Sequence, residues 1–62
     1  MAINSGAQLQ AALQNKGASD YNAAVDFARS TSDYSRIASY LTTVLGETVE
    51  IIAAEQFKQS VG

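Results

Sequence analysis

The sequence predicts an all-α fold, a small helical bundle or hairpin that forms one domain over residues 1–62. Two short N-terminal helices are expected to precede one long amphipathic helix over about 33–59. Two observations predict this fold: apolar residues recur at helical spacing over a long stretch, and serine and aspartate stand where helices would begin.

The long amphipathic stretch begins at Asp33 and keeps its pattern to about Ile52. At about 100° per residue, its apolar side chains fall in one arc of roughly 160°, with Thr48 as the one polar residue inside it. We therefore expect this arc to be buried. Its members are Tyr34, Ile37, Ala38, Leu41, Val44, Leu45, Val49 and Ile52.

Gly46 is the strongest punctuation in this stretch and suits a helix C-cap. The apolar arc nevertheless keeps its phase beyond it, and a glycine on the polar side costs a helix only about 1 kcal/mol relative to alanine. We therefore expect the helix to continue through Gly46. A β-hairpin is the open alternative, with Leu41–Leu45 and Thr48–Ile52 as strands and Gly46-Glu47 as the turn.

A first short helix is predicted to begin at Ser5. Gln8 follows Ser5 at the capping-box spacing, and Ile3 stands ahead of the cap, where a hydrophobic staple would place it. Lys16 complements the negative end of this helix, and Gly17 suits a left-handed position just beyond it. The helix should therefore end at Lys16.

A second short helix is predicted from Ser19 as N-cap to Arg29, with Asp20 in its first turn. The hydroxyl-rich run Ser30–Ser32 competes with helical hydrogen bonding, so the chain should turn there. Ser32 and Asp33 would then restart it as cap and first-turn acid. Tyr21 and Tyr34 are expected at the edge of the core.

The apolar pattern changes face beyond Ile52. Polar side chains occupy the former arc, and the apolar ones point roughly the opposite way. In a straight helix these last turns would pack against something other than the helices that cover the main arc, with Phe57 as the anchor. Tyr40, at the rim of the main arc, is added to this surface. The predicted interface therefore comprises Tyr40, Ala53, Ala54, Phe57 and Val61.

Side chains suited to catalysis or metal binding are few. The chain has no histidine and no cysteine, so the usual zinc, haem and iron–sulfur ligands are missing. Glu47 and Glu50 would share one side of a helix, but on its solvated arc and without a further ligand. The serines have no base or nucleophile elbow beside them. We therefore expect that the protein is not an enzyme and that it binds no cofactor and no small-molecule substrate.

The formal net charge is −2, from four basic and six acidic residues spread thinly along the chain. No basic patch indicates nucleic-acid binding, and no apolar run approaches the roughly 20 residues that span a bilayer. No secretory leader is expected at the N-terminus. Weak surface ion pairs are predicted at a spacing of three residues: Asp26 with Arg29, Asp33 with Arg36, and Glu55 with Lys58.

The composition is rich in alanine, serine, glutamine, asparagine and threonine, and is similar to that of small helical subunits of phage particles and bacterial filaments. A core of this size also gains stability from association. The sequence therefore favours a structural subunit present in many copies, such as a component of a virion, a tail or a filament. Its expected location is a virion or another extracellular assembly. The alternative is a soluble helical adaptor or regulator that dimerises and binds one protein partner.

Overall fold

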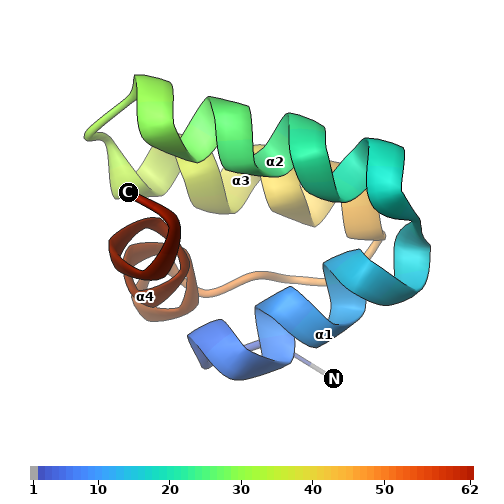
Figure 1. The fold of residues 1–62 in the computed structure, drawn as a ribbon. Coiled ribbons are helices and arrows are strands. Elements are labelled where there is room, and N and C mark those ends of the chain that lie inside the picture. Colours follow the sequence, from blue (N-terminus) through green and yellow to red (C-terminus); the bar gives the residue numbers. More distant parts are fainter. Residues whose placement is uncertain (1) are drawn as a thin grey trace.

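The computed structural model describes residues 2–62 and confirms the all-α class. Helices α2 and α3 lie antiparallel and side by side, and α1 and α4 pack across one face of this pair, with α4 seen end-on in Figure 1. The four helices are α1 (Gly6–Lys16), α2 (Ala18–Ser30), α3 (Tyr34–Leu45) and α4 (Ile51–Val61).

Helix α1 begins and ends where the sequence predicts. Ser5 is the N-cap, and its Oγ accepts a hydrogen bond of 3.2 Å from the Gln8 backbone N–H. The Gln8 side chain reaches back as in a capping box, but its Oε1 accepts from the Asn4 N–H and not from Ser5. Gly17 closes the helix at φ 139°, a backbone angle open to glycine, and its N–H donates to Leu13 O.

The start of α2 differs from the predicted one by two residues, and that of α3 by one. Gly17 also serves as the N-cap of α2, so Ser19 lies within the first turn and is not the cap. Asp33, and not Ser32, caps α3, with its Oδ1 accepting a 3.2 Å hydrogen bond from the Arg36 N–H. The turn between the two helices is confirmed at residues 31–33.

The prediction of one long helix is wrong, because the helix is interrupted between Gly46 and Glu50. Gly46 has φ 71°, in the left-handed region, and its N–H donates to Thr42 O at 2.9 Å as the C-cap of α3. A β-hairpin is not formed either, since Leu41–Leu45 is helical and the only β-pairing among residues 2–62 is one isolated bridge.

The linker between α3 and α4 is held by the N-terminal segment. Ile3 and Val49 form the isolated parallel bridge, in which the Ile3 N–H donates to Thr48 O at 2.8 Å and the Glu50 N–H donates to Ile3 O at 2.9 Å. The Val49 N–H donates to the Thr42 side chain at 2.9 Å. The Val49 and Glu50 N–H groups and the Thr48 carbonyl, which a continuous helix would have paired internally, therefore have other partners.

This break explains why the apolar pattern changes face after Ile52. Helix α4 starts anew at Ile51 in its own direction and turns Ala53, Ala54 and Phe57 into the core, each with no exposed surface. Ile52 was expected inside the buried arc, but it lies outside the core with 52% of its surface exposed. The change of face reflects a new helix direction, not a second apolar strip on one straight helix.

The core draws on all four helices and on both partners of the bridge. Its largest fully buried side chains are Leu9, Leu13, Ile37, Leu41 and Phe57. Tyr21 and Tyr34 lie at its edge, as predicted, and the rings of Tyr21 and Phe57 form a T-shaped pair with a centroid distance of 6.5 Å. Five large buried side chains and several alanines make a small core for a free-standing domain.

Helices α1 and α4 approach closely at Gly6. A methyl group on Gly6 would lie 2.8 Å from Gln56 Cβ and within 3.3 Å of the α4 backbone. The Gly6 N–H donates to Gln56 Oε1 at 2.8 Å, which satisfies a donor at the start of α1. Glycine is thus required here for close packing.

None of the three predicted ion pairs forms among the described residues. Two of the cations instead hold the carboxyl ends of helices together: Lys58 Nζ donates to Ala28 O, and Arg29 Nε donates to Val61 O, each at 2.7 Å. Carbonyl groups in the last turn of a helix lack an internal partner and carry partial negative charge. These contacts therefore link the ends of α2 and α4.

The buried and exposed members of the predicted arc should respond differently to truncation. Leu41→Ala, at a fully buried position, should lower the free energy of unfolding by about 2–5 kcal/mol. Ile52→Ala removes a half-exposed side chain and should cost about 1 kcal/mol or less. Urea denaturation followed by circular dichroism measures both. Equal losses would contradict the placement of Ile52 outside the core.

Gly6→Ala should destabilise the fold by about 1–3 kcal/mol, because the added methyl group must push α1 away from α4. The same denaturation assay measures the loss. A variant as stable as the parent would show that the two helices are not in such close contact.

Candidate functional site

An aromatic pair lies between α2 and α3. The rings of Phe27 and Tyr40 are tilted by 39° with their centroids 4.8 Å apart, and both side chains are half-buried. Next to this pair is an open groove of about 390 Å³, which we call the aromatic groove; it is lined by Phe27, Ser35, Arg36 and Ser39. It combines an aromatic surface with hydroxyl groups and one cation.

The Arg36 side chain is available at this groove. It is exposed, and its guanidinium group makes no hydrogen bond or ion pair with any of the described residues. The neighbouring Asp33 carboxylate caps α3 and does not line the groove. An incoming carboxylate would therefore meet an arginine with all of its donors open.

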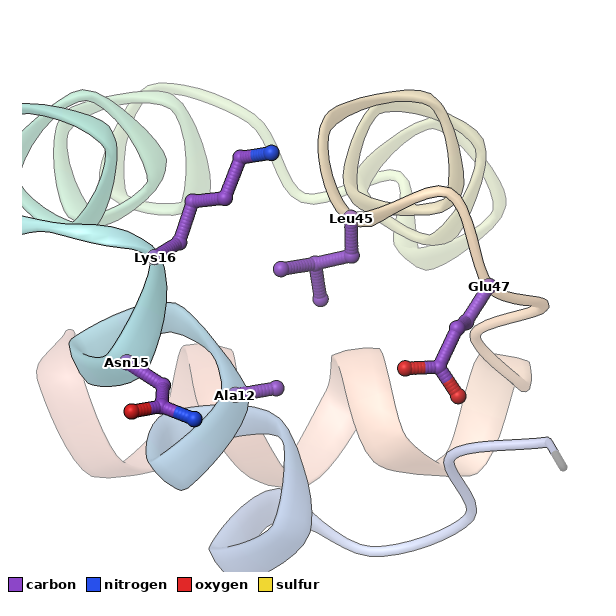
Figure 2. A pocket seen from close by; sticks show the side chains of 5 residues that line it. All are labelled: Ala12, Asn15, Lys16, Leu45 and Glu47. Carbon is purple, nitrogen blue, oxygen red and sulfur yellow. The ribbon is translucent and has the colours of Figure 1, made fainter.

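A second depression lies between α1 and the end of α3. It measures about 250 Å³ and is lined by Ala12, Asn15, Lys16, Leu45 and Glu47. Figure 2 shows Leu45 and Glu47 projecting into it from α3 and the following loop, facing the α1 residues. Its wall carries a cation and an anion, so it has no single charge preference.

Two large apolar side chains are exposed at the start of α4. Ile51 and Ile52, here called the isoleucine pair, are 53% and 52% exposed. The exposed Glu50 precedes them, and Glu55 follows at the helical spacing that makes it a neighbour of both. The pair is thus an apolar protrusion between carboxylates.

The residues predicted to form an interface are divided by the structure. Ala53, Ala54 and Phe57 are fully buried and belong to the chain's own core, so Phe57 does not face away from the main apolar residues. Tyr40 and Val61 are half-buried and pack on the outside of that core. Contact with a partner stays a prediction for Tyr40 and Val61, whereas the other three could reach one only if the fold opened.

Side chains that could carry chemistry do not gather in the described part of the chain. Within residues 2–62 no three acidic side chains lie close enough together to hold a metal ion. Glu47 and Glu50 are exposed in the linker, so the helical side that the sequence suggested for them does not exist. The arrangement offers surfaces for binding, and the prediction that the chain is not an enzyme stays a prediction.

Sequence reasoning missed both new surface features. The isoleucine pair was hidden because Ile52 fitted the phase of a continuous helix. Arg36 was assigned to an ion pair with Asp33, although an aspartate directly before a helix is also a common N-cap. Reading Gly46 as a C-cap would have revealed the pair. In a separate helix, at about 100° per residue, Ile51 and Ile52 both lie roughly 110° or more from the centre of the face that Ala53, Ala54 and Phe57 form.

Comparisons with known proteins identify no family or relative for this chain. No protein-family model matches the chain, and neither the curated proteins nor the solved structures contain a significant match. None of the helices in residues 2–62 has the length and hydropathy needed to cross a membrane.

Phe57→Ala should unfold or strongly destabilise the chain, with a loss of about 3–5 kcal/mol, because the ring is fully buried and contacts Tyr21. Helicity and any association should be lost together. Ile51→Ala on the exposed side of the same helix is the matched control and should keep its helicity. Circular dichroism and sedimentation measure the two properties. A helical Phe57→Ala variant that only fails to associate would place the ring at an interface.

Proposed function

We propose that this chain is a non-enzymatic structural subunit that acts in many copies within a larger assembly, such as a virion, tail or filament. The isoleucine pair is the observation that carries the proposal. Adjacent isoleucines that are each about half exposed leave apolar surface in water on a chain with few large apolar residues to spare. Contact with another protein surface would remove it from water.

The small core supports the same proposal. Its largest fully buried side chains number five, and no disulfide is available because the chain has no cysteine. Small domains of this kind commonly gain stability by association. A subunit that is only marginally stable alone is well suited to a role within an assembly.

The second candidate is a soluble adaptor that binds one protein partner. The aromatic groove favours it, since aromatic side chains and arginine are enriched at the centres of protein interfaces. One groove of this kind would dock a single apolar and acidic segment. The two candidates differ in what the purified chain does alone.

Self-association should depend on concentration and on the isoleucine pair. The double variant Ile51→Ser, Ile52→Ser should keep the helicity of the parent and raise the dissociation constant for self-association by about tenfold or more. The control variant Ala7→Ser, Ala11→Ser makes the same number of polar replacements at exposed positions of α1 and should associate like the parent. Sedimentation equilibrium and circular dichroism provide the readouts.

Three results distinguish the proposals. Growth to large particles with rising concentration supports the structural subunit. A stable dimer at every concentration supports the adaptor. A parent chain that stays monomeric at millimolar concentration contradicts self-assembly.

A further inference from the structure

We propose that copies of this chain contact one another head to tail, with the isoleucine pair of one copy seated in the aromatic groove of the next. This inference rests on the proposed function and names its contact surfaces. The two surfaces share no residue: the pair lies on α4, and the groove lies between α2 and α3. One copy can therefore use both at once.

Charge determines which surface the isoleucine pair can meet. Glu50 precedes the pair and Glu55 neighbours both isoleucines on the helix. Two pairs that met across a two-fold axis would bring these carboxylates together, which is unfavourable. The partner surface must instead offer apolar area beside a cation.

The aromatic groove meets this requirement. Phe27 provides apolar surface, and the Arg36 guanidinium beside it has no partner among the described residues. Glu50 or Glu55 of an incoming copy would supply the carboxylate that the arginine can bind with two parallel hydrogen bonds. The other depression carries Glu47 as well as Lys16 in its wall, so its cation is accompanied by an anion and it is less suited to an acidic protrusion.

The contact is heterologous, because the pair of one copy meets the groove of another and leaves a pair and a groove free at the two ends. Such contacts form rings when the rotation closes and open filaments when it does not. The surface of one copy is 3639 Å², of which a standard interface would cover about a fifth at about 800 Å² per partner. Two contacts per copy therefore fit on this small chain.

A mixing experiment tests this arrangement with two blocked chains. Ile51→Ser, Ile52→Ser removes the pair and keeps the groove, whereas Arg36→Glu reverses the groove's charge and keeps the pair. Each chain alone should show about a tenfold or greater loss of self-association. Mixed together, they should form a 1:1 dimer that grows no further, since the one intact pair can enter the one intact groove. Sedimentation velocity measures the sizes, and circular dichroism verifies that both variants are folded.

The matched control is Lys16→Glu, which makes the same charge change at an exposed cation outside the groove. This variant should assemble like the parent. Assembly of Arg36→Glu like the parent, or a mixture of the two blocked chains that stays monomeric while the parent assembles, would overturn the head-to-tail contact and leave the proposed function standing. A monomeric parent would overturn both.

Discussion

The pairing of the N-terminal segment with the linker after α3 is the contact on which the helix arrangement depends. Two backbone hydrogen bonds join Ile3 to the linker, and the Thr42 side chain accepts a third from Val49. The linker turns at residues 46 and 47 and has no helical hydrogen bonding over residues 48–50, so Thr48, Val49 and Glu50 would expose unpaired backbone groups without these partners. Because Ile3 and Val49 are also buried, the same contact connects the linker to the core.

The direction of α4 follows from this contact and determines the surface of the molecule. The helix crosses beside α1 at Gly6 and is linked to the end of α2 through Lys58 and Arg29. With its alanines and Phe57 turned inward, α4 leaves the isoleucine pair outside. The apolar surface that we assign to assembly is thus a consequence of how the core is filled.

Local signals in the sequence predicted much of the fold, because caps and short apolar periods involve neighbouring residues. Ser5, Lys16 and Gly17 bound α1 as expected, and Ile37 and Leu41 are buried as the arc predicted. The candidate surfaces were less predictable. Tyr40 was placed at the rim of the core, but its partner Phe27 comes from another helix. The apolar periodicity of a single helix does not predict which residue of another helix it contacts.

The sequence by itself determined that the chain is helical, where its first helix begins and ends, and that histidine and cysteine chemistry is absent. The tertiary structure decided whether Gly46 ends a helix or lies within one. Glycine adopts a left-handed C-cap readily, and inside a helix it costs only about 1 kcal/mol relative to alanine, so contacts with distant residues decide between the two. Here the partner is Ile3, more than forty residues away along the chain, and its pairing with Val49 turned a predicted interface into core and a predicted core residue into surface.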